Sequence, residues 1–450
     1  MDTAFFSDLL GSIAERGRGL LGLKTWPSDS LQQASSLADL CQSLLTGKGE
    51  ASGIALAREI LDRYATLDGD GRARFFQALA RDFGPDDARL SAILKNWNES
   101  TREALGADLH YASEPRRQEL FRRLNRAPGG TQALVAMRAD LLAMKTKHPE
   151  YKIIDRDFSH LLNSWFNRGF LVLRRIDWST PAAILEKVIR YEAVHEIHDW
   201  NDLRRRTDPV DRRCYAFFHP ALNDEPLIFV EVALTAEIPN AIAPLLAENR
   251  VQLPLEKART AVFYSISNCQ KGLAGISFGN FLIKQVVEEL RREFPKLETF
   301  VTLSPVPGFM AWVKSKPELP SGLPELPDAS VLEGGGWTKD VDESERMARL
   351  LEPLAAHYFL AAKAGNNRPY DPVARFHLGN GARLERINVL GDPSKKGLRE
   401  AAGLMVNYLY DLDHIEKNHE AFENQGEVVT SSSVRKMLKS DRLSRFSLRA

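Results

Sequence analysis

The stretch Tyr264-Ser-Ile-Ser-Asn-Cys-Gln-Lys-Gly-Leu-Ala-Gly-Ile-Ser-Phe-Gly279 decides the fold of this chain. The apolar, β-branched run that leads into it, Ala261-Val-Phe-Tyr264, predicts a buried strand. Three glycines lie in its second half, and the segment 281–294 that follows has the apolar spacing of an amphipathic helix. A glycine loop between a strand and a helix presents free backbone N–H groups and the positive helix end to an anion. The stretch therefore predicts a pyrophosphate-binding loop.

The spacing of the glycines limits which classes of ligand the loop is expected to bind. It fits neither G-x-G-x-x-G nor G-x-x-x-x-G-K-[ST], which disfavours nicotinamide, flavin and P-loop nucleotide sites. The order Gln270-x-Gly272-x-x-Gly275 is similar to the Q-x-x-G-x-G/A loop of GNAT-fold acetyltransferases, which holds the pyrophosphate of coenzyme A, but differs by one residue in spacing. From this loop alone, an ordinary strand-to-helix turn is an equally good interpretation.

Length and composition indicate a multidomain protein of ordinary globular character. The 450 residues are long enough for two or three domains, and 60 basic residues balance 60 acidic ones, which gives no field favouring nucleic acid or an anionic membrane. No uninterrupted apolar stretch approaches the roughly 18 residues of a membrane span. Three scattered cysteines predict neither a disulfide framework nor a zinc site, so we expect a cytoplasmic protein.

The composition and the hydrophobic pattern of the chain change near residue 166. Residues 1–165 are rich in Ala, Leu, Arg, Asp and Glu and carry apolar stripes at helical spacing, such as Leu134, Met137 and Leu141, which predict an all-α helical bundle used for packing or assembly. Residues 166–450 instead carry strand patterns. The resulting fold class is α+β multidomain, a helical bundle followed by a mixed α/β domain.

Within the second region we expect a mixed sheet. Strands are predicted at 170–174, 213–219, 226–235, 297–303 and 383–388, a helix at 181–194, and a helix or a strand at 401–412. A hairpin is expected between 213–219 and 226–235, and a β-loop-α-β crossover should make a parallel pair next to the glycine loop. The segment 315–345 is rich in Pro and Gly, which predicts a loop.

Two side chains are candidates for catalytic roles. Ser304 follows the strand after the motif helix, so it should lie at the carboxyl end of the parallel pair, close to the ligand. His377 lies in Arg375-Phe-His-Leu-Gly-Asn-Gly381, where we expect a loop, and is a suitable acid–base partner for a serine. A plain turn serine and a surface histidine are the alternatives.

Other polar residues give weaker signals. His219 has the neighbours of a structural histidine, and His195 with His198 lacks a third metal ligand, so no metal site is predicted. Cys269 is expected to be a packing residue rather than a nucleophile. The cluster Arg204-Arg-Arg206 with Arg212-Arg213 could meet a phosphate, but a solvated face is the preferred interpretation.

Several separated motifs together resemble the malonyl-CoA decarboxylase family. They are Gln270 to Lys284, Leu303-Ser-Pro-Val-Pro-Gly-Phe309, Phe376-His-Leu-Gly-Asn-Gly381 and Gly403-Leu-Met-Val-Asn-Tyr-Leu-Tyr410, in this order along the chain. The resemblance covers most of 166–450. It implies a helical N-terminal domain, a GNAT-like catalytic domain, conversion of malonyl-CoA to acetyl-CoA and CO2, and homo-oligomers, often tetramers, with no metal or prosthetic group.

The resemblance also implies roles for particular residues. The family's catalytic serine and histidine fall on Ser304 and His377, and its functional tyrosine falls on Tyr410. The residues that match its CoA-binding loop are Gln270, Gly272, Ala274, Gly275, Ile276, Ser277, Phe278, Gly279 and Asn280. Some family members have a glutamate where this chain has Ser277, so a role for that carboxylate does not carry over. The chain also lacks a C-terminal Ser-Lys-Leu, which implies a bacterial-type cytoplasmic form.

Two other classes of function stay open at this point. An acyl-CoA-dependent N-acyltransferase would use the same loop and would transfer acetyl to an amine without releasing CO2. A non-enzymatic acyl-CoA sensor would bind without turnover and would change its assembly with ligand.

Overall fold

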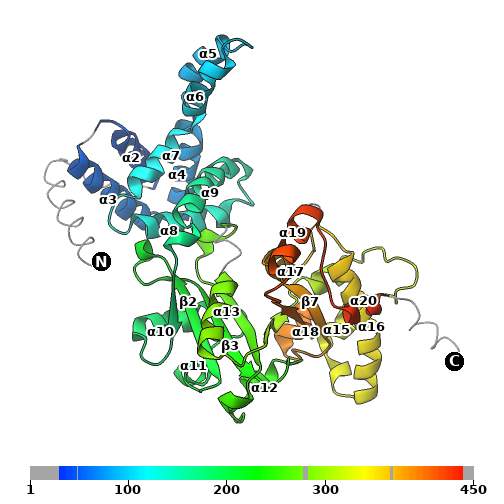
Figure 1. Ribbon diagram of the computed structural model, residues 1–450. Helices are drawn as coiled ribbons and strands as arrows, with labels where there is room; N and C mark the ends of the chain where they lie inside the picture. The colour runs from blue at the N-terminus through cyan, green and yellow to red at the C-terminus, as the bar shows by residue number, and fades with distance from the viewer. Residues whose placement is uncertain (1–29, 48, 277–281, 365–367, 439–450) are drawn as a thin grey trace. The chain divides into compact units, whose positions relative to one another are not determined.

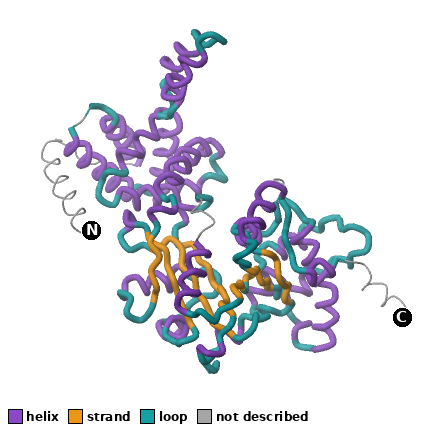
Figure 2. The backbone as a smooth tube through the Cα atoms, in the orientation of Figure 1, coloured by secondary structure: helices purple, strands orange, loops and turns teal. Residues whose placement is uncertain are grey.

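The computed structural model describes residues 30–47, 49–276, 282–364 and 368–438. The chain forms two compact units. The first comprises residues 1–172, 218–227 and 270–278, and the second comprises 173–217, 228–269 and 279–450. Helices make up most of the first unit and a mixed sheet with helices makes up the second, which confirms the predicted fold class (Figure 1, Figure 2). No helix among the described residues has the length and apolar character needed to cross a bilayer.

The first unit is built from the predicted apolar stripes. Leu134, Met137 and Leu141 are fully buried, as are the aromatic side chains Phe75 and Phe76. Its helices are α2 (Ser30–Leu44), α3 (Glu50–Thr66), α4 (Gly69–Asp82), α5 (Asp87–Lys95), α6 (Arg102–Ser113), α7 (Arg116–Leu124), α8 (Gly130–Met144), η1 (Pro149–Tyr151), α9 (Lys152–Trp165), η2 (Arg168–Phe170), η3 (Pro220–Leu222) and η5 (Lys271–Leu273). Asp86 is the N-cap of α5, because its carboxylate accepts from the Arg89 N–H.

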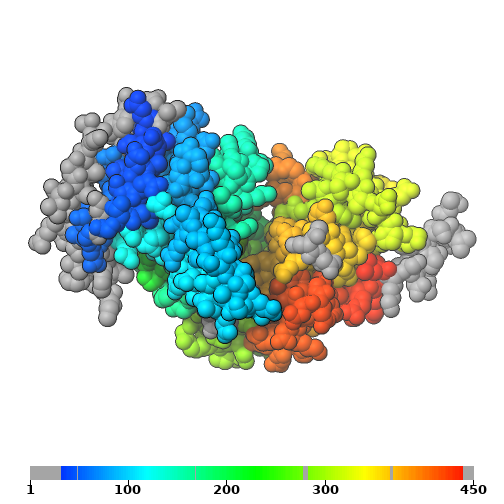
Figure 3. Space-filling model, turned by 90° about the horizontal axis from the view of Figure 1, so that it is seen from above, coloured from blue at the N-terminus to red at the C-terminus, as the bar shows by residue number. Residues whose placement is uncertain are grey.

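Helices α5 and α6 differ from the rest of the first unit. They project from the other helices in Figure 1 and form part of the light-blue surface in Figure 3. None of the residues of α5 is buried, and only Ala112 of α6 is. Large apolar side chains such as Tyr111, which is 66% exposed, therefore face solvent on this pair of helices.

The second unit is organised around a sheet whose strand order is β1-β2-β3-β4-β5-β8-β6, with β7 paired to β8. The strands are β1 (Val172–Ile176), β2 (Arg212–Phe218), β3 (Pro226–Thr235), β4 (Thr260–Asn268), β5 (Thr299–Thr302), β6 (Ser304–Pro305), β7 (Arg383–Asn388) and β8 (Met405–Leu409). Strand β4 pairs antiparallel with β3 and parallel with β5, so the sheet is mixed and contains the expected parallel pair. Its core includes Val262, Tyr264, Val301, Leu303 and Met405.

Helices flank the sheet and connect its strands. They are α10 (Ala182–Tyr191), α11 (Trp200–Thr207), α12 (Ala243–Leu246), η4 (Leu255–Lys257), α13 (Leu282–Glu293), α14 (Phe309–Lys314), α15 (Ala329–Gly334), η6 (Gly336–Thr338), α16 (Val341–Leu360), α17 (Pro372–Gly379), α18 (Lys395–Ala401), α19 (Ile415–Gln425) and α20 (Ser432–Met437). The motif helix α13 buries Leu282, Val286 and Leu290, as its amphipathic pattern predicts.

Two predictions need correction in this unit. The segment 315–345 is not one loop, because α15, η6 and the start of α16 lie in it. Asp328 and Asp340 cap α15 and α16 through their side chains, and these local signals outweigh the Pro/Gly content. The undecided segment 401–412 contains strand β8, which joins β5, β6 and β7 in the sheet.

Candidate active site

A cavity opens where strands β4 and β5 separate. The two strands pair in parallel from Thr260 and Thr299 as far as Phe263 and Thr302, where β5 ends. In the β3–β4 register Glu231 lies opposite Ser265 and Val232 lies opposite Phe263, so Tyr264 is the extra residue of a β-bulge. A bulge bends its strand and strengthens the local twist. Past this bend a cavity of about 250 Å³ lies against β4.

Ser304 lies on the wall of this cavity that faces β4. It begins the two-residue strand β6, which is fixed by antiparallel pairing of Ser304 with Val406 of β8. The Ser304 Oγ lies 2.9 Å from Thr302 Oγ1 and 3.2 Å from His377 Nε2. The structure thus brings the two side chains predicted for chemistry into hydrogen-bond contact.

His377 lies in the last turn of helix α17, not in a loop, so this part of the prediction is wrong. The helix begins at Pro372, and the Asp371 carboxylate caps it by accepting the N–H groups of Val373 and Ala374 at 2.9 Å each. Asp followed by Pro is a helix-start signal that the sequence analysis missed. The other Asp371 oxygen accepts the Gly308 N–H at 3.2 Å, which joins the start of α17 to the segment after Ser304.

The imidazole of His377 is enclosed by two tyrosines of β8 and the segment after it. Its Nδ1 lies 2.8 Å from Tyr410 Oη, and the Tyr408 ring stacks on it with centroids 4.7 Å apart. Burial lowers the pKa of His377 to about 3 and raises the pKa of Tyr410 well above its usual value, because both charged forms would lose hydration. Serine, histidine and tyrosine are therefore all uncharged at neutral pH.

The rest of the cavity is mostly apolar. Its lining residues are Val194, Phe263, Tyr264, Ile266, Asn268, Ser304, Pro305, Pro372, Val373, Phe376 and His377. The segment that carries Val194 is held to β4 by Glu192, whose carboxylate accepts the Val194 N–H at 2.8 Å and the Ser265 hydroxyl at 2.8 Å. Such a largely apolar chamber presents Ser304 and His377 as a hydrogen-bonded polar pair on its wall.

The glycine loop has structural reasons for some of its residues. A Cβ on Gly272 would lie 1.8 Å from the Val135 carbonyl oxygen, and the Gly272 carbonyl accepts from Arg138 at 2.7 Å, so helix α8 requires glycine there. The Gln270 side chain donates to the Pro226 carbonyl at 3.0 Å. No ligand is needed to explain either residue.

Gly275 and Ala274 differ from these two residues because they are exposed. Gly275 has φ +76°, and no atom lies within 4 Å of the position of a Cβ. A residue whose backbone approaches a ligand is expected to have both properties. Ile276 is buried. The predicted loop residues Ser277, Phe278, Gly279 and Asn280 lie outside the described residues.

The weaker candidates have structural roles. His219 uses both ring nitrogens, with Nδ1 accepting the Ala221 N–H and Nε2 lying 3.1 Å from the Trp165 carbonyl oxygen. Among the described residues no group of three or more His, Cys, Asp or Glu side chains could hold a metal ion. Cys269 is buried.

The solvated face expected for the arginine cluster holds for Arg204, which is exposed, but not for Arg206 and Arg213. Arg206 is buried and pairs with Asp202 and Glu231, and Arg213 is buried against Glu293. These buried carboxylates supply the counter-charge that the sequence pattern could not reveal, and the same pairs leave neither side chain facing a phosphate.

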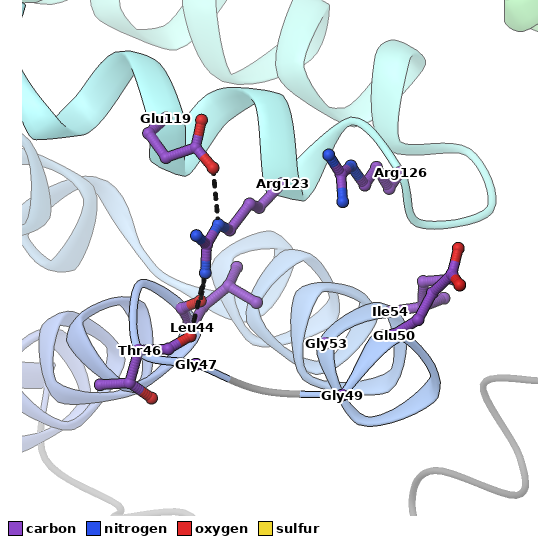
Figure 4. A pocket seen from close by; sticks show the side chains of 10 residues that line it. All are labelled: Leu44, Thr46, Gly47, Gly49, Glu50, Gly53, Ile54, Glu119, Arg123 and Arg126. Atoms are coloured by element: carbon purple, nitrogen blue, oxygen red, sulfur yellow. Dashed lines mark hydrogen bonds and ion pairs between the residues drawn. The ribbon is translucent and has the colours of Figure 1, made fainter. Parts of the chain in front are cut away.

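The helical unit has a cavity of its own, of about 210 Å³ (Figure 4). The Arg123 guanidinium in its wall donates to Glu119 at 2.8 Å and to the carbonyl oxygens of Leu44 and Thr46. The residues that line it include no serine, cysteine or histidine. It therefore lacks a serine–histidine pair like that in the cavity beside β4.

The chain is similar to known proteins over most of its length. The family model "Malonyl-CoA decarboxylase C-terminal domain" matches residues 169–447, and "Malonyl-CoA decarboxylase N-terminal domain" matches residues 83–166. The mitochondrial malonyl-CoA decarboxylase of Anser anser anser is 37% identical over 415 residues, which are 84% of this chain and 82% of that protein.

Solved structures give a closer similarity. The malonyl-CoA decarboxylase of Rhodopseudomonas palustris is 56% identical with a TM-score of 0.85, and that of Agrobacterium vitis is 54% identical with a TM-score of 0.84. In both comparisons 90% of this chain and 99% of the other chain are covered.

Proposed function

The chain belongs to the malonyl-CoA decarboxylase family and catalyses the decarboxylation of malonyl-CoA to acetyl-CoA and CO2, and we propose that Ser304 and His377 carry out the chemistry. The single observation that supports this assignment is the 3.2 Å contact between Ser304 Oγ and His377 Nε2 at the wall of a largely apolar cavity.

The apolar cavity favours loss of CO2 from the malonyl group. The malonyl carboxylate carries its charge on two oxygens, and as the carbon–carbon bond breaks this charge moves onto the thioester as an enolate. A chamber lined by Phe263, Pro305 and Phe376 solvates the compact carboxylate poorly, so the departure of its charge is favoured. Hydrogen-bond donors aimed at the developing enolate oxygen stabilise it, and each such donor typically contributes about 3–4 kcal/mol.

Ser304 and His377 then complete the reaction. Their hydroxyl and imidazole groups hold the malonyl carboxylate, and the same pair supplies the proton that the enolate carbon must take up and regains a proton from solvent before the next turnover. Tyr410 orients the imidazole through Nδ1. The carbon–carbon bond electrons pass to the enolate and then to the new C–H bond, so no covalent bond to the serine is required.

The coenzyme portion of the substrate is assigned to the glycine loop. The residues that match the family's loop are Gln270, Gly272, Ala274, Gly275, Ile276, Ser277, Phe278, Gly279 and Asn280. Among these residues, Gly275 and Ala274 give the strongest support for coenzyme binding. Both are exposed, and Gly275 has the positive φ that lets a main chain approach a phosphate.

Three further properties are part of the proposal. Turnover needs no metal or prosthetic group, because a carbonyl thioester can itself accept the electron pair. The protein works in a reducing cytoplasm, where its three buried cysteines stay reduced. It assembles into a homo-oligomer, with the helical bundle (residues 1–165) for packing and the catalytic domain (166–450) for chemistry.

One assay tests the proposed function. Purified protein should release equal amounts of CO2 and acetyl-CoA from malonyl-CoA with chelator present, and Ser304→Ala or His377→Asn should each lower kcat by at least ~100-fold. His357→Asn is the matched control, because His357 lies on α16 and not on the cavity wall, so it should keep wild-type turnover. Full activity in both cavity variants would contradict the assignment of catalysis to Ser304 and His377.

A further inference from the structure

The hydroxyl of Ser304 has two neighbours but a single hydrogen to donate. Its geometry makes Ser304 Oγ the donor to Thr302 Oγ1 at 2.9 Å. The second neighbour, His377 Nε2, lies at 3.2 Å. Because the serine hydrogen is already engaged with Thr302, the contact with His377 is a hydrogen bond only if Nε2 carries the hydrogen.

The hydrogen bond at Nδ1, on the other side of the imidazole, is consistent with a hydrogen on Nε2. The neutral ring has one N–H, so an Nε2–H leaves a lone pair on Nδ1. Tyr410 Oη, 2.8 Å away, can donate to that lone pair, and among the described residues His377 is its one hydrogen-bond partner. If Nδ1 carried the hydrogen instead, the Tyr410 hydroxyl hydrogen would be buried without an acceptor in the described part of the chain.

Thr302 is itself held in place by the neighbouring strand. It is the last residue of β5 and is completely buried. Its Oγ1 also accepts the Tyr408 N–H at 3.1 Å, and its carbonyl oxygen accepts from Asn407 Nδ2 at 2.9 Å. Strand β8 therefore fixes the acceptor that Ser304 faces.

We infer that Thr302 is a positioning residue: by accepting the Ser304 hydrogen it fixes His377 as the Nε2–H tautomer, so that the hydrogen bonds run from Tyr410 through His377 and Ser304 to Thr302. In this arrangement the histidine faces the serine as a donor and not as a base. Ser304 is consequently not activated as a nucleophile in the resting site. The inference rests on the proposed roles of Ser304 and His377.

The tautomer can be measured directly on the resting protein. In ¹⁵N-histidine-labelled protein at neutral pH, His377 should give a protonated Nε2 and an unprotonated Nδ1, and His377→Gln identifies its signals by their loss. An Nδ1–H signal for His377 in the wild type overturns the inference whatever the variants do. This readout needs no turnover, so it can fail while the proposed decarboxylation stands.

Two substitutions test the part played by Thr302. Thr302→Val removes the hydroxyl at nearly constant shape and frees the Ser304 hydrogen to donate to Nε2, which should shift His377 toward Nδ1–H. Thr302→Ser keeps the hydroxyl and should keep the wild-type tautomer. We expect Thr302→Val to lower kcat about tenfold while KM changes less than about twofold, and Thr302→Ser to recover most of the activity.

Reactivity of the serine gives a second readout. A fluorophosphonate, which reacts with serines activated by a base, should label Ser304 faster in Thr302→Val than in the wild type, because only the variant lets His377 act as the base. A merely structural Thr302 would not produce a gain in labelling. Equal labelling of both proteins, or an unchanged tautomer in a folded Thr302→Val protein, contradicts the inference.

Discussion

At the scale of single residues, burial determines the chemical state of the site. Ser304, His377 and Tyr410 are each at most 6% exposed, and the charged forms of the histidine and the tyrosine are disfavoured by lost hydration. A neutral imidazole within a hydrogen-bond chain can hold and pass a proton without introducing a charge that would compete with the malonyl carboxylate. The proposed chemistry therefore relies on hydrogen bonds between uncharged groups.

The Tyr410 hydroxyl should contribute to kcat through His377. Tyr410→Phe removes one hydrogen bond at 2.8 Å and leaves Nδ1 without a partner, while the ring keeps its packing. An unmade buried hydrogen bond costs about 1–3 kcal/mol, so we expect kcat to fall roughly 5- to 100-fold. Steady-state decarboxylation measures this, with KM as the internal control. A wild-type kcat would show that the hydroxyl has no part in the reaction.

Stability should depend on pH through two buried histidines. Burial lowers the pKa of His377 to about 3 and that of His195 to about 4, whereas an unfolded histidine titrates near 6.5. Below pH 6.5 the unfolded chain binds more protons than the folded one. The stabilisation is therefore complete above about pH 6.5 and is lost as pH falls through about 4.

Urea unfolding at about pH 7.5 and about pH 5 measures this effect. The midpoint should be lower at the acidic pH, and His195→Asn should reduce the difference between the two midpoints. A midpoint difference unaffected by this substitution would mean that other groups cause the acid sensitivity.

At the scale of elements, patterns that repeat along the chain were predicted well. The strand 383–388 has the predicted bounds, and the strand-loop-helix around the glycine motif is present as β4, η5 and α13. Alternating apolar residues mark such elements because one face must be buried. Shorter elements stabilised by a single cap, such as α15 and α17, were mistaken for loops, since one Asp side chain is a weak signal in a Pro/Gly-rich context.

The site was predictable only in part. Ser304, His377 and Tyr410 were named from sequence and contact one another, although their roles are still proposals. Thr302, Asp371 and Glu192 were not named as site residues. Each also contacts a residue 63 to 106 positions away along the chain, as Thr302 contacts Tyr408, and only the folded chain brings such pairs together.

Two glycines of the motif should behave differently when changed to alanine. Gly272→Ala places a Cβ 1.8 Å from the Val135 carbonyl oxygen, a clash with backbone that side-chain movement cannot relieve. We expect a loss of more than about 3 kcal/mol in stability. Gly275→Ala meets no atom within 4 Å and adds only the strain of φ +76°, about 1–2 kcal/mol.

The two alanine substitutions also distinguish an effect on folding from an effect on substrate binding. Gly275→Ala should raise KM for malonyl-CoA in protein that stays folded, whereas Gly272→Ala should lower the unfolding midpoint first. Unfolding curves together with KM values distinguish the two effects. An unchanged KM in Gly275→Ala would contradict the assignment of this position to the coenzyme.

At the scale of the whole molecule, each of the two units has its own buried core and its own buried polar pairs. In the helical unit, Arg117 and Asp157 form an ion pair in which each side chain is 5% exposed. In the catalytic unit, Arg206 is enclosed with Asp202 and Glu231. Ser304 and His377 both lie in the second unit, so a change in helix α9 of the first unit, away from the glycine loop, should leave their chemistry intact.

Asp157→Ala tests this separation. It leaves the Arg117 charge buried without its partner, which typically costs 3–5 kcal/mol, so the helical unit should unfold at a lower denaturant concentration. The kcat of protein that is still folded should stay at the wild-type value. Unfolding of two units need not be two-state, so far-UV CD and intrinsic fluorescence should be followed together. A lower kcat in the folded variant would assign the helical unit a part in turnover.

The central claim is that Ser304 and His377 act as one unit, and a double-mutant cycle on kcat tests it most directly. Residues that act together lose their joint contribution when either is removed. We therefore predict that the double variant Ser304→Ala/His377→Asn decarboxylates malonyl-CoA about as fast as the slower single variant. If the two losses multiply instead, the serine and the histidine act independently and the account is contradicted.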